Sequence, residues 1–398
     1  MRSVELKTWK LAAVILAFGS VGWVTPHEPT VLRTLVIGGG PDQEHNQVAI
    51  ESNVRYLARI LPANAPMRVL FADGDLKSEN VQCQDDAGKI YYRAPELPRL
   101  DGPAKTPNVK AELDRLAEQV GTSSSPVLLY FTGHGSPNRP SEYNNNQFDL
   151  WGGDDFSVSD VAHSLAKFPK GAPVTLVMVQ CFSGAFGNVL FENGDPTAPL
   201  VEQRVCGFFA AVPQRMAAGC TPQIREADYK DFSGYFFSAL TGVDRLGKTI
   251  SGADFNHDGK VGMNEAFDFS LLYDDSIDTP VCTSDTFLRR FVTTPDAKVF
   301  ETSYAKTRSW ASSGQLAALD GLSDLLGLQG DDRLATAFDE FNRIDPNSED
   351  LRDVRLIRFA RLAKSIILAH TLNTTGDRKL KARYTNLLQL ESRNPLRD

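Results

Sequence analysis

The chain has 398 residues, of which 42% are hydrophobic and 23% are charged, and its formal net charge is −8. This length and composition predict a globular protein of two or three domains with a substantial buried core. The negative charge argues against general nucleic-acid binding, because a nucleic-acid-binding surface is usually basic.

The N-terminus has the pattern of a targeting segment. Three basic residues precede an apolar run that extends from Leu11 to Val24. This run has the length of a signal-peptide hydrophobic region and is short for a membrane span. We therefore expect residues 1–22 to be a signal peptide and the protein to be secreted or periplasmic. The alternative is an uncleaved anchor formed by the same segment, and we expect no other stable membrane span.

Strands and helices alternate along the first part of the chain. The predicted strands are residues 33–37, 67–71, 127–132, 174–180 and 205–212. The predicted helices are residues 48–60, 109–120, 159–167, 185–191 and 232–240. Residues 74–106 are polar and contain prolines, so we expect an insertion or a long loop there. The alternation predicts an α/β fold, with a mostly parallel sheet covered by helices on both faces.

The chain changes character near Trp310. Residues 311–398 are rich in Leu, Ala, Arg and Asp, show helical spacing and contain no clear strand, so we expect an all-helical accessory domain. Basic residues recur at every third position of one predicted helix, at Arg352, Arg355, Arg358, Arg361 and Lys364. This period precesses around an α-helix, so it forms no single basic face, and we expect a solvated helix.

Two of the predicted strands end in residues that suit catalysis. One ends in Gly133-His134-Gly135, and the other ends in Gln180-Cys181, 47 residues after the histidine. The carboxyl ends of parallel strands meet at one edge of a sheet, so neighbouring strands would place the imidazole beside the thiol. A cysteine attacks as the thiolate and needs a base, which we expect to be His134. We expect the backbone amides of Gly135 and Cys181 to form the oxyanion hole.

The segments Thr132-Gly133-His134-Gly135 and Gln180-Cys181-Phe182-Ser183-Gly184 resemble those of clan CD cysteine peptidases, the group of caspases, metacaspases, legumains and gingipains. The first strand and its glycine turn are most similar to the legumain-type (C13) branch and its bacterial relatives. The resemblance covers roughly residues 33–245. It implies a caspase-like α/β/α sandwich within residues 30–295, a His134/Cys181 dyad and hydrolysis of a protein or peptide substrate.

The chain departs from that family's pattern at the positions that determine specificity. Legumains usually carry acidic residues on both sides of the nucleophile, where this chain has Gln180 and Phe182. The turn after the first strand lacks the arginine with which caspases and legumains read the P1 side chain. The P1 preference therefore does not follow from the resemblance. By analogy, we expect Ala211 and Gln214 to help form the wall of the S1 pocket.

Five cysteines are present, at positions 83, 181, 206, 220 and 282. An exported protein can form disulfide bonds, and an odd number of cysteines leaves one thiol over. We expect that thiol to belong to Cys181, because it lies at a strand end. Cys206 and Cys220 bracket one strand and turn and are candidates for a disulfide, although spacing alone does not determine connectivity.

Residues 254–265 match the twelve-residue calcium loop of an EF-hand. The expected Ca2+ ligands are the side chains of Asp254, Asn256, Asp258 and Glu265 and the main-chain carbonyl of Lys260. Glycine at position 6 of the loop allows its sharp bend. The preceding segment is a weak helix candidate and no second loop is found, so we expect a structural Ca2+ site more than a sensor. The alternative is a polar turn that binds no metal.

The sequence thus predicts an exported cysteine endopeptidase with a structural Ca2+ site. The alternative is a catalytically inactive caspase-like protein that binds calcium and acts as a protein-interaction module. A serine hydrolase of the α/β type is disfavoured, because the chain lacks the G-x-S-x-G motif.

Overall fold

A computed structural model describes residues 31–121, 124–374 and 377–397 of the chain. The expected signal segment, residues 1–22, lies outside these ranges. Within them, no helix combines the length and the apolar composition that crossing a membrane requires.

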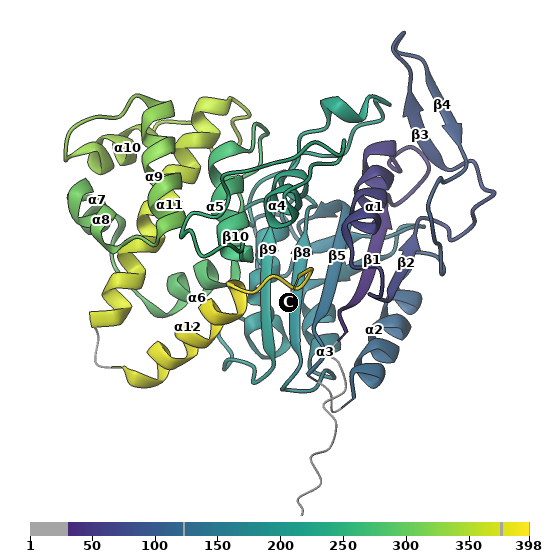
Figure 1. Ribbon diagram of the computed structural model, residues 1–398, viewed down its shortest axis with the longest axis horizontal. Coiled ribbons are helices and arrows are strands. Elements are labelled where there is room, and N and C mark those ends of the chain that lie inside the picture. Colours follow the sequence, from purple (N-terminus) through teal and green to yellow (C-terminus); the bar gives the residue numbers. More distant parts are fainter. Residues whose placement is uncertain (1–30, 122–123, 375–376, 398) are drawn as a thin grey trace, which may run out of the picture.

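An eight-stranded sheet forms the centre of the molecule (Figure 1). Its main path runs β10-β9-β8-β5-β1-β2, and all neighbours on this path are parallel except β10, which is antiparallel to β9. The strands of this path are β1 (Arg33–Gly39), β2 (Met67–Phe71), β5 (Val127–Ser136), β8 (Pro173–Met178), β9 (Arg204–Phe209) and β10 (Val281–Cys282). The central strands β5 and β8 are almost continuously apolar and buried, as expected of parallel strands with both faces covered.

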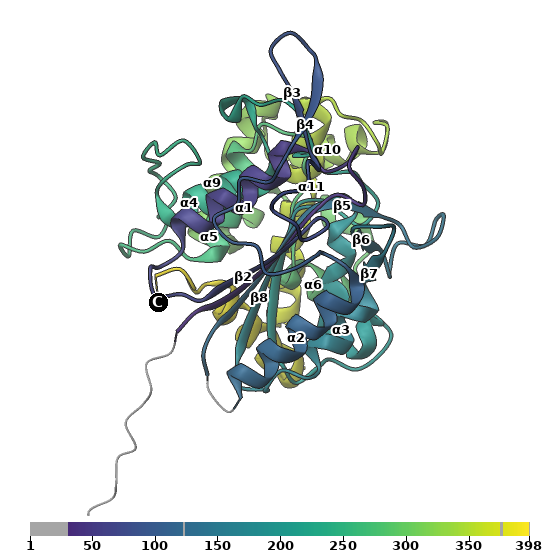
Figure 2. The same ribbon diagram turned by 90° about the vertical axis from the view of Figure 1, so that its right-hand side faces the viewer.

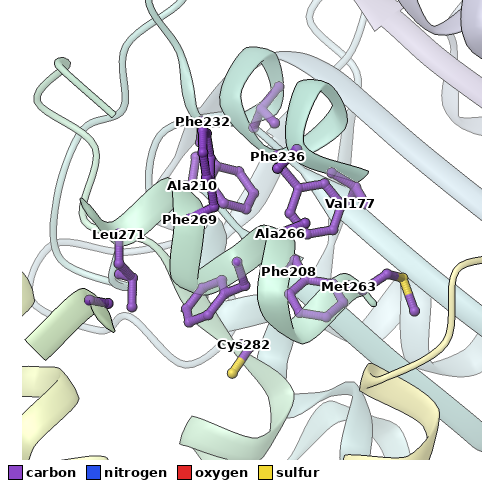
Figure 3. Close-up of a cluster of buried hydrophobic side chains, with 14 of the residues drawn as sticks. Val177, Phe208, Ala210, Phe232, Phe236, Met263, Ala266, Phe269, Leu271 and Cys282 are labelled. Carbon is purple, nitrogen blue, oxygen red and sulfur yellow. The ribbon is translucent and has the colours of Figure 1, made fainter. Parts of the chain in front are cut away.

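Helices cover both faces of the sheet (Figure 2). One face carries α1 (Val48–Ile60), α4 (Phe232–Thr241) and α5 (Met263–Tyr273), and the other carries α2 (Thr106–Val120) and α3 (Val158–Leu165). Successive side chains of a strand point to opposite faces, so Phe208 and Phe209 of β9 belong to different cores. Phe208 packs among residues of α4 and α5, and the centroid of its ring lies 5.0 Å from the centroid of the Phe236 ring (Figure 3). The predicted α/β class is therefore confirmed.

Two local predictions differ from the structure. Residues 74–106 contain a β-hairpin, β3 (Val81–Gln84) and β4 (Ile90–Arg93), which projects from the body of the molecule (Figure 1). The predicted α-helix after the nucleophile is instead the 3-10 helix η1 (Ser183–Leu190). The remaining short elements are β6 (Gln147–Asp149), β7 (Asp155–Ser157), η2 (Glu192–Gly194) and η3 (Glu226–Asp228).

Helices make up the C-terminal part of the chain, and no strand follows β10 in the described residues. They gather on the side of the sheet where β9 and β10 lie (Figure 1). They are α6 (Thr283–Phe291), α7 (Asp296–Phe300), α8 (Tyr304–Trp310), α9 (Ser313–Leu326), α10 (Arg333–Phe341), α11 (Leu351–Thr374) and α12 (Arg378–Glu391). One continuous apolar core includes Phe208 of the sheet, Phe267 of α5 and Phe359 of α11. The helical region and the sheet therefore share a core.

The basic run on α11 does not form a solvated face, so that expectation was wrong. A step of three residues turns the side-chain direction by about 60° around a helix, so five residues at this spacing cover about 240° and cannot all face solvent on a packed helix. Arg358 is 1% exposed, and its guanidinium donates to four main-chain carbonyls and lies 3.6 Å from the carboxylate of Asp274. Arg355 pairs with Asp275 at 3.2 Å.

Candidate active site

The sheet register brings His134 and Cys181 to neighbouring strand ends. Phe131 of β5 pairs with Met178 of β8, and each of the two candidate residues comes three positions after its member of that pair. The approach is close at Gly135, where a Cβ atom would lie 2.5 Å from the main-chain oxygen of Cys181. Only glycine fits at this position.

Two acceptors hold the imidazole of His134. Its Nε2 atom lies 2.9 Å from the main-chain oxygen of His45 and 2.9 Å from Oε1 of Gln47. A carbonyl oxygen can only accept a hydrogen bond, so Nε2 carries the proton and Nδ1 keeps a free lone pair. Burial and the neighbouring His45 lower the pKa of His134. The ring is therefore neutral at pH 7 and can accept a proton at Nδ1.

The Cys181 thiol is partly exposed and receives one main-chain hydrogen bond. The amide of Ala217 donates to Sγ over 3.3 Å. Burial raises the pKa of Cys181, and the Ala217 N–H opposes that shift. No hydrogen bond joins the thiol to His134 in the described part of the chain. The resting pair is thus a neutral thiol beside a neutral imidazole.

The turn after the nucleophile is held on both sides. Phe182 has a φ of 60°, a left-handed conformation that costs a non-glycine residue on the order of 1–3 kcal/mol. Its N–H donates to the main-chain oxygen of Arg215 over 2.8 Å. The fully buried Asn146 donates to the oxygens of Phe182 and Pro213, at 3.0 and 2.9 Å. These contacts stabilise the turn that aims Cys181.

Gln47, His45, Asn146 and Arg215 were not identified as site residues in the sequence. They come from three separate segments, and only the folded chain brings them beside the two strand ends. The single hint was the polar run at residues 144–146, which follows the His134 strand.

The two residues expected to line the S1 pocket have different environments. Ala211 is fully buried, and its carbonyl packs against Gly184, where an added Cβ would lie 2.5 Å away. Ala211 therefore supports the nucleophile turn from below and does not face an accessible pocket. Gln214 is exposed near the site, as is the half-exposed Met216.

All five cysteines are free, so the expected disulfide between Cys206 and Cys220 is not formed. Cys206 lies within β9, fully buried in the core, with Sγ 3.6 Å from the Thr175 hydroxyl. Cys220 lies beyond the strand at the active edge, with Sγ 3.5 Å from the main-chain oxygen of Gly133. Cys206 lies within a strand of the sheet and Cys220 lies at the edge of the sheet, so the two thiols are not adjacent. Burial raises the pKa of both.

The loop at residues 254–265 is a tight turn closed by its own side chains. His257 and Gly259 are left-handed, with φ values of 59° and 85°. Asp254 accepts hydrogen bonds from the amides of Asp258 and Gly259, at 3.2 and 3.0 Å. Glu265, in the first turn of α5, accepts from three loop amides at 3.0 to 3.1 Å.

The expected Ca2+ ligands are thus arranged around one loop, but their carboxylates face loop amides. Asn256 accepts from the Asp258 amide at 2.8 Å, and Asp258 accepts from the Lys260 amide at 2.9 Å. Within the described ranges, no three His, Cys, Asp or Glu side chains converge closely enough to hold a metal ion. The loop leads directly into α5, whereas α4 ends at Thr241, well before it. The weak entering helix is consistent with the sequence expectation.

No protein-family model matches the chain, and no curated protein matches it. Some solved structures show a weak likeness. A structural genomics protein from Geobacter sulfurreducens has 13% identity and a TM-score of 0.36, over 63% of this chain and 91% of that one.

Two structures of a secreted C11 cysteine protease from Bacteroides thetaiotaomicron also show a likeness. The complex with an irreversible peptide inhibitor has 12% identity and a TM-score of 0.29, over 68% of this chain and 70% of that one. The second structure has 11% identity and a TM-score of 0.29, and the match covers 79% of this chain and 85% of that one. Similarities this weak establish neither the fold nor the activity of this chain, which rest on its own residues.

Proposed function

We propose that this protein is an exported cysteine endopeptidase of the caspase-like type, which hydrolyses peptide bonds with Cys181 as nucleophile and His134 as base and acid. One observation carries the proposal. The Nε2 atom of His134 donates to a main-chain carbonyl, which leaves the Nδ1 lone pair available, and β5, which carries His134, is paired with β8, which leads to Cys181.

Acylation begins with a proton transfer from Cys181 Sγ to Nδ1 of His134. The resulting thiolate attacks the carbonyl carbon of the scissile bond, and the negative charge moves to the carbonyl oxygen. The amides of Gly135 and Cys181 are the proposed donors to that oxygen. The C–N bond then breaks, the amine leaves with the proton from His134, and a thioester remains on Cys181.

Deacylation reverses the roles of the same groups. A water molecule gives a proton to His134 and attacks the thioester carbonyl. The C–S bond breaks, the sulfur takes the proton back from His134, and the product leaves as a carboxylic acid that loses its remaining proton to solvent. Burial favours the neutral forms of both Cys181 and His134, so the resting enzyme holds a neutral pair and the thiolate forms only when the proton is transferred at the start of acylation.

The test is labelling and cleavage with single-residue variants. Cys181→Ala and His134→Ala should each lower cleavage of a peptide library by on the order of 10³-fold or more. Cys220→Ala is the matched control, because that thiol is also near the site but lies against the Gly133 carbonyl, with Sγ 3.5 Å from its oxygen, and has no assigned role in the reaction. Iodoacetamide should label Cys181 faster in the wild type than in His134→Ala.

Two outcomes would contradict the proposal. Undiminished cleavage by Cys181→Ala would remove the nucleophile from the mechanism. Slow labelling that is independent of His134, with no peptide cleaved, would favour the inactive, protein-binding alternative.

We also propose that residues 254–265 bind a structural Ca2+ ion. Asp254, Asn256, Asp258 and Glu265 would supply side-chain oxygens, and Lys260 its main-chain oxygen. The left-handed residues at 257 and 259 support this, because they give the loop the tight turn such a site needs. The amide contacts of Asp258 and Glu265 do not prevent binding, because each carboxylate oxygen has a further lone pair for the ion. The ion would offset two of the three negative charges that Asp254, Asp258 and Glu265 carry in the loop and the first turn of α5.

A further inference from the structure

We infer that the C-terminal helical region positions the nucleophile, with Arg358 and Asp278 as positioning residues that act through the segment 213–220. This inference rests on the proposed function, since it assigns a role in the same site. Its physical basis is a chain of main-chain contacts that leads from α11 to the Cys181 thiol.

The first link joins α11 to the loop at residues 274–280, between α5 and β10. The guanidinium of Arg358 donates to the main-chain oxygens of Leu271, Asp274, Ser276 and Asp278, at 3.4, 2.5, 3.0 and 2.7 Å. Buried carbonyls need donors, and a planar guanidinium can satisfy several at once where a lysine ammonium cannot match the geometry. Arg358 therefore fixes the path of this loop.

The second link joins the 274–280 loop to the segment beside the thiol. Asp278 is fully buried, and its two carboxylate oxygens accept from the amides of Ala218 and Phe232, at 2.6 and 2.8 Å. The residue before Ala218 donates its own amide to Cys181 Sγ. A displacement of Asp278 would therefore move the Ala217 N–H that donates to the sulfur.

A second arginine makes an independent connection to the same region. The guanidinium of Arg215 donates to the main-chain oxygens of Pro346 and Ser348, in the loop before α11. The carbonyl of Arg215 accepts the N–H of Phe182, the residue after the nucleophile. Two sets of hydrogen bonds from the helical region thus reach the residues that surround the thiol. An accessory domain that could be removed without effect on the site would not need these contacts.

The decisive variant is Arg358→Lys in the full chain, with Arg289→Lys as the matched control. Arg289 also joins α6 to α11, through Ser365 at 3.1 Å and the Arg361 carbonyl at 3.3 Å, but it does not touch the 274–280 loop. Both variants keep the charge. The readouts are the pH profile of iodoacetamide labelling at Cys181, kcat and KM for a cleaved peptide, and the melting temperature.

Arg358→Lys should raise the apparent pKa of Cys181 by about one unit, because the Ala217 N–H no longer stabilises the thiolate. It should lower kcat by about tenfold or more, with KM changed less than about twofold. Arg289→Lys should leave the labelling profile unchanged even where its melting temperature falls equally. An unchanged profile in Arg358→Lys, or an equal shift in Arg289→Lys, would overturn the inference.

A second variant covers the case in which Arg358→Lys does not fold. Asp278→Asn keeps the side-chain shape but loses one of the two acceptors, so amide hydrogen exchange in residues 213–220 should accelerate at least tenfold, roughly the effect of one hydrogen bond. Unchanged exchange in that segment would overturn the inference. Labelling and exchange need no peptidase activity, so a wild type that cleaves no peptide would refute only the proposed function.

Discussion

Gln47 is the side chain that controls the candidate base most directly. It is 8% exposed, and its Oε1 atom shares the Nε2 proton of His134 with a carbonyl. An amide oxygen orients the ring without adding charge. The pKa of His134 therefore stays low and the ring stays neutral, which the proposed mechanism requires.

Replacing that amide by a carboxylate tests this role. Gln47→Glu should raise the pKa of His134, because an opposite charge stabilises the imidazolium. The acidic limb of the pH profile of kcat should therefore move to higher pH by about one unit. In the wild type that limb should lie below the ordinary histidine pKa of about 6.5, since burial lowers it. Activity should therefore be lost at a higher pH in the variant.

Gln43→Glu is the control for Gln47→Glu. It adds the same charge to the same turn, but Gln43 is bound to the Glu79 carbonyl and does not contact the imidazole. Its acid limb should remain within about 0.2 pH units of the wild type, because an exposed charge is screened by solvent. Identical profiles for both variants would exclude Gln47 as the partner that sets the protonation of His134.

At the scale of elements, the loop 254–265 and α5 form one unit. Glu265 closes the loop from the first turn of α5, and α5 packs against the Phe208 side of the sheet. A ligand that fixes the loop would therefore also stabilise the helix that contacts the central core.

Calcium addition checks this coupling. At about 100 times the dissociation constant, a bound ion adds about 2.7 kcal/mol to the unfolding free energy, so the melting temperature should rise by about 5 °C. Glu265→Gln should abolish the rise, because it removes a carboxylate expected to bind through both oxygens. The measurement is differential scanning calorimetry after exhaustive chelation.

Asp244→Asn is the matched control for the calcium experiment. Asp244 makes a similar turn with the amides of Leu246 and Lys248, but it lies outside the calcium loop. This variant should keep the full calcium-dependent rise. A wild type whose melting temperature does not respond to calcium would refute the metal site and leave a polar turn.

At the scale of the whole molecule, the helical region and the sheet share one core. Glu391 of α12 is buried and accepts hydrogen bonds from the Thr283 hydroxyl and the Ser284 amide of α6, at 2.7 and 2.8 Å. Burial raises the pKa of Glu391 to about 7. Apolar and polar contacts thus cross the boundary that the change in composition near Trp310 suggested.

A shared core predicts a single cooperative unfolding transition. Two of the chain's four tryptophans lie in the described residues and report on the two parts, because Trp151 lies beside the sheet and Trp310 lies in α8. In a chain that also carries Trp9→Phe and Trp23→Phe, the variants Trp151→Phe and Trp310→Phe each keep one tryptophan. They should unfold in urea with midpoints that agree within about 0.2 M when followed by the fluorescence of that tryptophan. Separate transitions for the two variants would show independently stable domains.

The sequence by itself determined the features that depend on local pattern. The apolar strands, their alternation with helices, and the positions of His134 and Cys181 at strand ends follow from periodicity and from the geometry of parallel sheets. The period-three run on α11 was misread, because helical periodicity alone does not show which face packs against a neighbour.

The tertiary structure alone decided the contacts between distant segments. Three contacts each join segments that are 36 to 87 residues apart. They are the contact of Gln47 with His134, the hydrogen bond from Asn146 to Phe182, and the hydrogen bond from Arg358 to Asp278. Residue type and spacing in the sequence do not indicate which distant residues form such contacts. They depend on which buried donors and acceptors the packed sheet and helices leave to be satisfied.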